Sequence, residues 1–214
     1  MDRRPPFPSD FKLYLASQSP RRHSLLRDVG VPFEVVPTEA QEWEGGVSAV
    51  EVAQANAAAK VKQACLPVGA MPGAFVLGTD TVVTVDGAVL GKPSCAKEAT
   101  EMLTRLSGRR HQVVSGIALR RLPAEPSQVD AAEPTVASAV TEVTFAALDR
   151  DQIEAYVASG EWRDKAGGYA VQGLAALFVA EVRGEYSNVV GLPLCLVASL
   201  FRDKGFDLLR RCWV

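Results

Sequence analysis

The segment Leu-Ala-Ser-Gln-Ser-Pro-Arg-Arg at residues 15–22 carries side chains suited to binding an anion. It joins a short apolar run to the start of a helix, because Ser-Pro suits the N-cap and first positions of a helix. The free N–H groups of a helix N-terminus attract anions. Ser17, Arg21 and Arg22 add hydroxyl and guanidinium groups that can bind phosphate oxygens. The segment predicts a phosphate site, with two solvated arginines on a surface helix as the alternative.

A second candidate is Asp80, within Gly-Thr-Asp-Thr-Val-Val at residues 78–83. The apolar run at residues 74–77 predicts that a strand ends just before it, which places Asp80 at the rim of a sheet, where ligands of α/β proteins bind. A carboxylate there could hold Mg²⁺ or orient a water molecule for attack. Gly-x-Asp is equally typical of a turn, so a turn residue is the alternative.

Two later segments could contribute to the same site. Lys92, in Gly-Lys-Pro, could neutralise phosphate charge, although a solvated surface lysine is the simpler interpretation. Residues 164–173 bring Asp164, Lys165, a pair of glycines and Gln172 into one segment. Such a segment could close over a ligand and form hydrogen bonds with the edge of a base.

The composition is that of an ordinary globular protein. The chain has 214 residues, 48% of them hydrophobic, with 23 Lys and Arg against 25 Asp and Glu. This balance argues against nucleic acid as a partner but leaves room for a local cluster of positive charge. Four widely spaced cysteines and two histidines form no zinc-binding pattern. No apolar run has the length of a membrane span or a signal-peptide core, which predicts a cytoplasmic protein.

Apolar periodicity and turn residues predict alternating strands and helices. Strands are expected at residues 13–16, 33–36, 74–77, 81–85, 89–90, 112–119, 136–145 and 177–182. Helices are expected at residues 20–29, 48–64, 94–106 and 149–159, with a last helix from Pro193.

The fold class expected from these elements is α/β with a mixed sheet. Residues 1–12 are expected to form a loose leader, and residues 13–214 a single domain that can divide into two lobes around a cleft. Residues 122–134 are rich in Pro, Ala and charge, so they are expected to form a surface loop.

Taken together, the motifs resemble those of the Maf family of nucleoside triphosphate pyrophosphatases, over about residues 13–202. The matching pieces occur in the order typical of the family, and most of them contain candidate residues. They are Leu-Ala-Ser-x-Ser-Pro-Arg-Arg (15–22), Lys60, Thr-Asp-Thr-Val-Val (79–83), Gly-Lys-Pro (91–93), Leu-Ser-Gly (106–108), Asp-Lys-Ala-Gly (164–167), Gln-Gly (172–173) and Asn-Val-Val-Gly-Leu-Pro-Leu (188–194). Eight pieces in one order are not expected by chance.

The resemblance implies an elongated two-lobed fold, similar to that of inosine triphosphate pyrophosphatases, with the active site in the cleft. It implies hydrolysis of a nucleoside triphosphate between the α and β phosphates, with release of pyrophosphate. The family uses a divalent metal cation, such as Mg²⁺ or Mn²⁺, and is often a homodimer. Because family members are linked to arrest of septum formation and cell division, the alternative is a nucleotide-sensing regulator that binds without cutting.

The same resemblance assigns roles to individual residues. Asp80 falls on the proton acceptor for the attacking water, and it is also expected to hold the metal. Glu42 falls on a family carboxylate that could assist at the metal, although the usual acidic pair is Gln41-Glu42 here. The residues expected to bind the substrate are Ser17, Arg21, Arg22, Lys60, Lys92, Asp164 and Lys165. Glu42 and Lys60 carry no signal of their own in the sequence.

Three positions favour the branch of the family that acts on dTTP and UTP. That branch resembles this chain in having Arg21 after Ser-Pro, Thr81 after the aspartate and Gln172 in the late segment. A branch that acts on 7-methyl-GTP carries Trp, Gln and Glu there instead. An amide can both donate to and accept from uracil or thymine, whereas a carboxylate suits the donor groups of guanine. The expected substrates are therefore dTTP, UTP or modified pyrimidine nucleotides.

Overall fold

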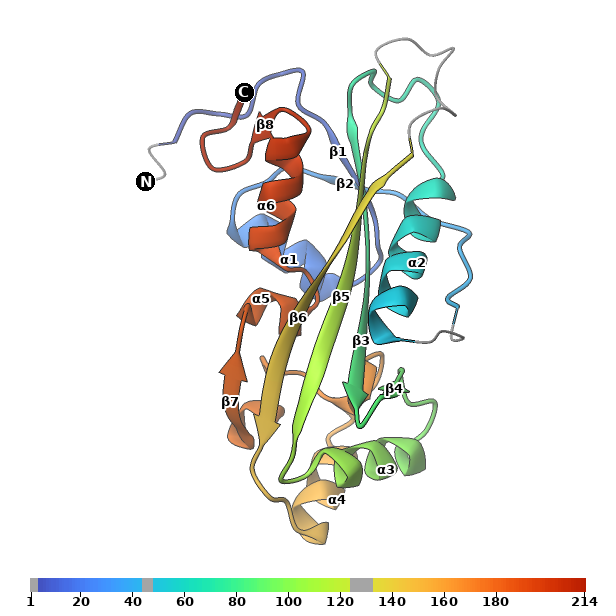
Figure 1. The fold of residues 1–214 in the computed structure, drawn as a ribbon, viewed down its shortest axis with the longest axis vertical. Helices are drawn as coiled ribbons and strands as arrows, with labels where there is room; N and C mark the ends of the chain where they lie inside the picture. Colours follow the sequence, from blue (N-terminus) through green and yellow to red (C-terminus); the bar gives the residue numbers. More distant parts are fainter. Residues whose placement is uncertain (1–3, 44–47, 124–132) are drawn as a thin grey trace.

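The computed structural model describes residues 4–43, 48–123 and 133–214, in which strands and helices alternate (Figure 1). The strands are β1 (Leu13–Ala16), β2 (Glu34–Val35), β3 (Phe75–Val85), β4 (Ala88–Leu90), β5 (Arg110–Arg121), β6 (Thr135–Phe145), β7 (Val179–Arg183), β8 (Phe206–Asp207) and β9 (Cys212–Trp213). The α-helices are α1 (Pro20–Asp28), α2 (Ala49–Lys62), α3 (Ala96–Leu106), α4 (Arg150–Ala158), α5 (Tyr186–Val190) and α6 (Leu194–Asp203). Two short 3-10 helices, η2 (Ala166–Gly168) and η3 (Leu174–Leu177), lie between α4 and β7.

Seven of the described strands form one mixed sheet in the order β2-β1-β3-β5-β6-β7, with β4 also paired to β3. Strands β2, β1 and β3 are parallel, and the pairs from β3 through to β7 are antiparallel. The long strands β3, β5 and β6 extend through most of the molecule (Figure 1). The predicted α/β class with an elongated mixed sheet is confirmed.

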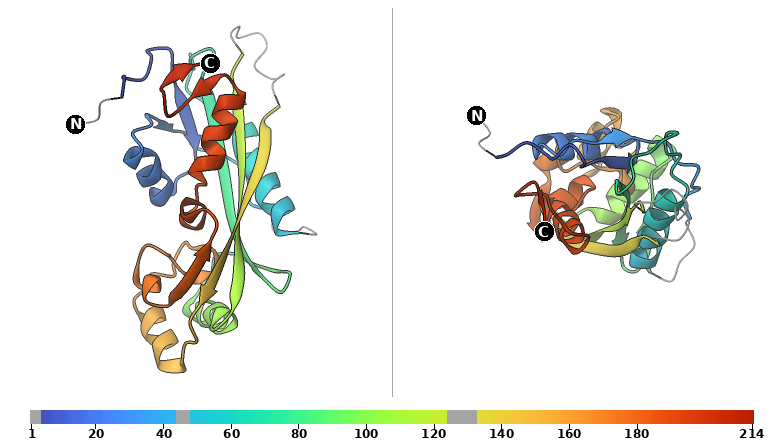
Figure 2. Two further views of the ribbon diagram at one scale, coloured as in Figure 1. Left: turned by 60° about the vertical axis from the view of Figure 1, so that its left-hand side comes forward. Right: turned by 90° about the horizontal axis from the view of Figure 1, so that it is seen from above.

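Alternate residues of β3 face opposite sides of the sheet, as the pleat of a strand requires. Leu77 packs in one hydrophobic cluster with Phe201 of α6, whereas Val76 packs in another with Val61 of α2. Helix α2 therefore covers one face of the sheet and α6 the other (Figure 2). Because Asp80 is in phase with Val76, it faces α2.

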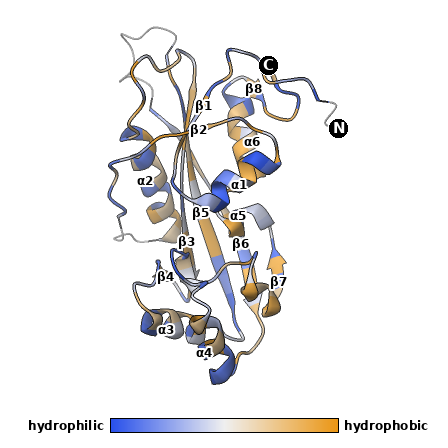
Figure 3. Cartoon of the chain, turned by 180° about the vertical axis from the view of Figure 1, so that it is seen from behind, coloured by the Kyte–Doolittle hydropathy of each residue, from blue (hydrophilic) through white to orange (hydrophobic). Residues whose placement is uncertain are grey.

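Two hydrophobic cores lie along the long strands, one towards each end. Strand β1, the first half of β3 and α6 contribute to the core nearer the chain termini. The second half of β3 packs with α3 and α4 in the other core. In Figure 3 the hydrophobic colour follows the central strands and α6, whereas α1 with its arginines is largely hydrophilic. Both cores therefore draw residues from the same long strands.

The structure corrects the prediction of two separate strand segments at residues 74–77 and 81–85. Strand β3 runs without a break from Phe75 to Val85, so Asp80 lies in the middle of a strand and not at its end. The reason is tertiary, because every residue from Phe75 to Thr84 pairs with β5. This continuous ladder overrides the turn tendency of Gly-Thr-Asp.

Local sequence signals identified most of the helix starts. The side chain of Ser48 caps α2, and Asp149 forms a capping box at the start of α4. Asp86 and Gly87 have positive φ angles in the turn that joins the antiparallel strands β3 and β4, as a tight hairpin turn requires. Ser19 stands at the N-cap position of α1, but its side chain makes no capping hydrogen bond. Helix α5 was not predicted.

The described part of the predicted leader, from residue 4 to residue 12, contains no helix or strand but packs against the core. Phe11 is buried, and its ring centroid lies 4.5 Å from that of Phe206 and 5.9 Å from that of Phe75. Residues 1–3 and most of the predicted surface loop at 122–134 lie outside the described residues. No helix in the described ranges is both long and apolar enough to cross a membrane.

Helix α2 approaches the sheet closely because two strand residues that face it are glycines. A Cβ atom on Gly78 would lie 2.7 Å from the carbonyl oxygen of Ala57. A Cβ atom on Gly116 would overlap the carbonyl group of Ala53. Only glycine permits such an approach of two backbones. The polar residues of α2 are thereby brought within reach of β3.

Gly78→Ala should destabilise the fold, because the added methyl group forces α2 away from β3. We expect the free energy of unfolding, measured by urea denaturation, to fall by about 1–3 kcal/mol. Gly91→Ala is the matched control, since a Cβ atom at Gly91 meets no atom within 4 Å; there we expect a change within about 0.5 kcal/mol. Equal stability of the two variants would contradict the close approach of α2.

Candidate active site

The pocket that collects the candidate residues lies where one edge of β3 has no neighbouring strand. Strand β1 ends at Ala16, opposite Gly78, and β4 pairs with β3 only at Val83 and beyond. Residues 79–82 pair with β5 on one side, and no strand of the described ranges pairs with them on the other. A cavity of about 440 Å³ opens at this gap. Side chains from both faces of the sheet can reach it.

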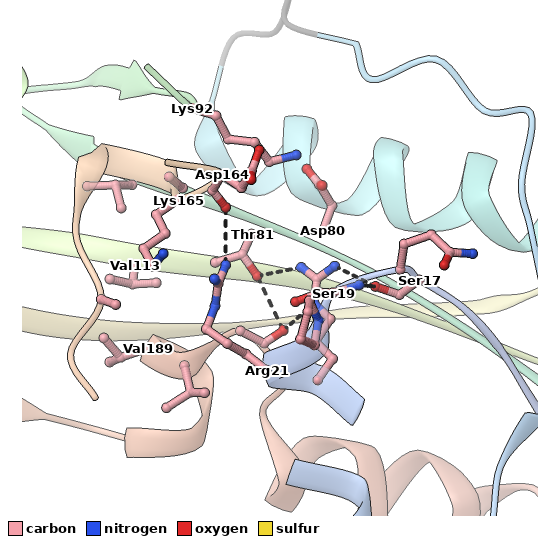
Figure 4. A pocket seen from close by; sticks show the side chains of 18 of the residues that line it. Ser17, Ser19, Arg21, Asp80, Thr81, Lys92, Val113, Asp164, Lys165 and Val189 are labelled. Carbon is pink, nitrogen blue, oxygen red and sulfur yellow. Dashed lines mark hydrogen bonds between the residues drawn. The ribbon is translucent and has the colours of Figure 1, made fainter. Parts of the chain in front are cut away.

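All the polar residues singled out from the sequence line this cavity. They come from the turn after β1, the first turn of α1, the loop before α2, α2 itself, β3, the loop after β4 and the segment around η2. They are Ser17, Arg21, Arg22, Glu42, Lys60, Asp80, Thr81, Lys92, Asp164, Lys165 and Gln172. In Figure 4, the side chains of Lys92 and Asp80 point toward each other, and Arg21 points toward Asp164.

Asp80 is held by two donors from one face of α2. Its side chain is only 8% exposed. Its Oδ1 accepts a hydrogen bond from Lys60 Nζ at 2.7 Å, and its Oδ2 accepts one from Asn56 Nδ2 at 3.0 Å. Asn56 and Lys60 are four residues apart, so they project from the same face of the helix. The carboxylate of Asp80 is therefore buried, paired and fixed in orientation.

Glu42 joins two lysines from different parts of the chain. Its Oε1 accepts from Lys60 Nζ at 2.9 Å and from Lys92 Nζ at 3.0 Å, and its Oε2 accepts from Lys92 Nζ at 3.1 Å. Burial opposes ionisation of Glu42, but the two lysines outweigh burial and lower the pKa of its carboxyl group to about 2. Glu42, Lys60, Asp80 and Lys92 form one continuous carboxylate–lysine network.

Arg22 is bound to the protein through all three of its guanidinium nitrogens. Nε donates to the carbonyl oxygen of Gly191 at 2.8 Å, Nη1 to Ser17 Oγ at 3.0 Å and Nη2 to Thr81 Oγ1 at 3.1 Å. The hydroxyl group of Thr81 also shares a hydrogen bond with Ser115 Oγ at 2.8 Å. Burial lowers the pKa of Arg22 to about 10, so it stays charged at neutral pH. Arg22 thus links the turn after β1, strand β3 and the end of α5. Only the N–H groups that are not used in these contacts remain to bind a phosphate.

The remaining charged residues connect α1 to the segment around η2. Arg21 Nη2 donates to the carbonyl oxygen of Asp164 at 3.2 Å (Figure 4). Lys165 Nζ donates to the carbonyl oxygen of Arg163 at 3.1 Å. Burial lowers the pKa of both Arg21 and Lys165. Gln172 is exposed to solvent and lines the same cavity.

The cavity has a strongly charged part and a more apolar part. The carboxylate–lysine network occupies the first, and Val83, Val113, Tyr169 and Val189 line the second. Figure 4 shows Val113 and Val189 on the same side of the cavity as Lys165. Lysine and arginine side chains suit a polyphosphate, and apolar walls with a few polar groups suit an aromatic base. The arrangement can therefore hold a nucleotide with its phosphates towards Asp80.

The carboxylates of Asp80 and Glu42 could bind a divalent cation in this cavity. In the described parts of the chain, no group of three or more His, Cys, Asp or Glu residues could by itself hold a metal ion. Mg²⁺ is usually bound by one or two carboxylates together with phosphate oxygens of the substrate. Asp80 and Glu42 fit that pattern, because both contact Lys60 Nζ and so lie side by side. To bind the cation, each carboxylate would give up a hydrogen bond from a lysine.

Asn56 is a member of this site that the sequence analysis did not identify. It is buried at 3% exposure and contacts Asp80 directly. A signal was present in the sequence, because asparagine is unfavourable inside a helix and stands here exactly one turn before Lys60, in an otherwise alanine-rich segment. An interior helical asparagine next to a candidate lysine indicates a specific partner.

Comparisons with known proteins agree with these features. A family model described as Maf-like protein matches residues 12–204. A dTTP/UTP pyrophosphatase of Symbiobacterium thermophilum is 46% identical over 198 residues, covering 92% of this chain and 96% of that protein. A dTTP/UTP pyrophosphatase of Moorella thermoacetica is 44% identical over 204 residues, covering 92% and 97%.

Among solved structures, a HAM1 protein from Coxiella burnetii aligns with a TM-score of 0.42 and 21% sequence identity, over 65% of this chain and 75% of that chain. The family match, by contrast, includes every segment that lines the cavity. The two curated relatives match nearly all of their own length at well over 30% identity. The chain belongs to the Maf family.

Proposed function

We propose that this protein hydrolyses nucleoside triphosphates between the α and β phosphates, giving a nucleoside monophosphate and pyrophosphate. The observation that carries the proposal is the buried Asp80 carboxylate, paired with Lys60 in a cavity lined by further cations. A carboxylate fixed beside several phosphate-binding groups is suited to accept a proton from water. Two relatives that are 46% and 44% identical to this chain bear the name dTTP/UTP pyrophosphatase, which supports the same activity here.

In the proposed reaction, Asp80 takes a proton from a water molecule as the water oxygen bonds to the α-phosphorus. The bond between the α-phosphorus and the bridging oxygen breaks, and pyrophosphate leaves with that oxygen. Lys60 and Lys92 stabilise the negative charge that develops on the phosphates, and Arg21 lies within the same cavity to assist. When bound at Asp80 and Glu42, a divalent cation such as Mg²⁺ or Mn²⁺ supplies further charge neutralisation.

We propose pyrimidine nucleotides, dTTP and UTP among them, as the substrates. Gln172 lines the cavity together with Thr81 and Arg21, and its amide can donate to and accept from a uracil or thymine edge. The Thr81 hydroxyl group is engaged by Arg22 and Ser115. Its proposed part in specificity is therefore to shape the cavity and not to contact the base.

Asp80→Asn should remove most of the activity without unfolding the protein. We expect kcat to fall at least about a hundredfold, because an amide cannot accept the proton of the water. Pyrophosphate release is measured with dTTP, and circular dichroism checks the fold. Asp86→Asn is the control, since Asp86 pairs with Arg109 in the hairpin and does not line the cavity. Near-normal turnover in folded Asp80→Asn would exclude Asp80 as the base.

Hydrolysis should depend on a divalent cation. We expect pyrophosphate release to stop after exhaustive chelation and to return with Mg²⁺ or Mn²⁺, because the proposed ligands are hard oxygen atoms. Glu42→Gln should raise the Mg²⁺ concentration for half-maximal activity about tenfold. Full activity in the chelated protein would contradict the metal proposal and leave the lysines to neutralise the phosphates alone.

The base preference can be measured with a panel of nucleotides that includes 7-methyl-GTP. We expect kcat/KM for dTTP and UTP to exceed that for 7-methyl-GTP at least about tenfold, because unpaired polar groups in the site penalise the wrong base. Gln172→Glu should reduce the ratio of kcat/KM for dTTP and UTP to kcat/KM for 7-methyl-GTP. If 7-methyl-GTP gave the highest kcat/KM, the assignment to the pyrimidine branch would be wrong.

A further inference from the structure

Helix α2 contains one interior asparagine, Asn56, whose amide group makes three hydrogen bonds. Its Oδ1 accepts from the backbone N–H of Trp43 at 2.7 Å, and its Nδ2 donates to the carbonyl oxygen of Trp43 at 3.1 Å. The same Nδ2 donates to Asp80 Oδ2 at 3.0 Å. The one acceptor atom and both N–H groups of the amide are therefore engaged.

The contact with Trp43 fixes which way the amide faces. A backbone N–H must meet the amide oxygen and a backbone carbonyl must meet the amide nitrogen, so a flipped amide would oppose like groups at both positions. With this orientation set, the second N–H of Nδ2 is directed at Asp80. A buried amide with fully satisfied partners is rigid, because leaving any of them unpaired is costly.

Asn56 joins Asp80 to Trp43, the residue next to Glu42, and the carboxylates of Glu42 and Asp80 both line the cavity. Trp43 directly follows Glu42, so holding the backbone of Trp43 also holds Glu42 against Lys60 and Lys92. Asp80 receives one donor at each carboxylate oxygen, Lys60 at Oδ1 and Asn56 at Oδ2. Beside Lys60, which contacts Glu42 and Asp80 through its side chain, Asn56 is thus a second link from the Glu42 loop to the carboxylate in β3, and it holds that loop by its backbone.

We propose that Asn56 is a positioning residue. It fixes the loop that carries Glu42 relative to Asp80, so that both carboxylates can act on one cation and one phosphate chain. This inference rests on the proposed function and extends it to a residue with no role in the chemistry itself. Asn56 acts through Glu42 and Asp80 and does not line the cavity. Its loss should therefore affect turnover and the placement of the loop more than the binding of the nucleotide.

The test compares Asn56→Ala with Gln54→Ala. Gln54 lies on the same helix and its amide also bonds to the sheet, through Nε2 to Ser138 Oγ at 3.1 Å, but it has no contact with Asp80 or Trp43. Asn56→Leu is a second variant for the case that the alanine variant does not fold, since it keeps the approximate size of the side chain without adding a charge next to Asp80. Both substitutions at position 56 remove the donor to Asp80.

The first readout is the fluorescence of Trp43, which does not depend on activity. Each variant is compared with its Trp43→Phe counterpart, and the difference reports Trp43 alone. We expect acrylamide quenching of Trp43 to rise about twofold in the Asn56 variants, because the loop is released, and to stay unchanged in Gln54→Ala. Unchanged quenching in the folded Asn56 variants would overturn the proposal.

The second readout separates kcat from KM in the pyrophosphate-release assay. We expect kcat to fall at least about tenfold in the Asn56 variants, with KM for dTTP changed less than about threefold, and neither to change in Gln54→Ala. A lower stability with unchanged kcat would overturn the proposal, since it would mark Asn56 as merely structural. If the wild-type protein releases no pyrophosphate, the proposed function itself fails, and Trp43 quenching still decides whether Asn56 holds the loop.

Discussion

The site depends on a gap in the edge of β3. Because β1 ends at Ala16 and β4 pairs only from Val83, residues 79–82 have a neighbouring strand on one side alone within the described structure. This short stretch lies between the end of the β1 ladder and the start of the β4 ladder, and segments distant in the sequence meet there. The start of α1, the loop before α2 and the segment around η2 all converge there. The ladder to β5 keeps β3 in place while the opposite edge stays open.

Helix α2 places a positively charged residue, Lys60, next to this gap. Gly78 allows the helix to approach so closely that Lys60 reaches a buried carboxylate. A buried lysine is tolerated because it is paired, and here it contacts both Asp80 and Glu42. In this state the two carboxylates stand where phosphate oxygens would be expected to bind. A triphosphate accompanied by a cation can replace them at the lysines without leaving either charge unpaired.

Most of the helices and strands and most of the residues around the cavity could be predicted from the sequence, but their arrangement could not. Caps such as Asp149 and the turn at Asp86 are local, so propensity alone locates them. Asp80 was predicted to lie just beyond the end of a strand because the apolar run stops at residue 77, whereas the rim at Asp80 is made by the end of the neighbouring strand β1. Pairing between strands is not encoded locally. Asn56 was missed for the same reason, since its partners lie 13 and 24 residues away.

The central claim is that water, with Asp80 as its base, attacks the α-phosphorus. Hydrolysis of dTTP in water enriched in oxygen-18, followed by mass spectrometry of the products, tests it directly. The account predicts that one labelled oxygen appears in the nucleoside monophosphate and none in pyrophosphate. Label in pyrophosphate would show attack on the β-phosphorus, and label in inorganic phosphate would show cleavage at the γ-phosphate. Either result would contradict the account.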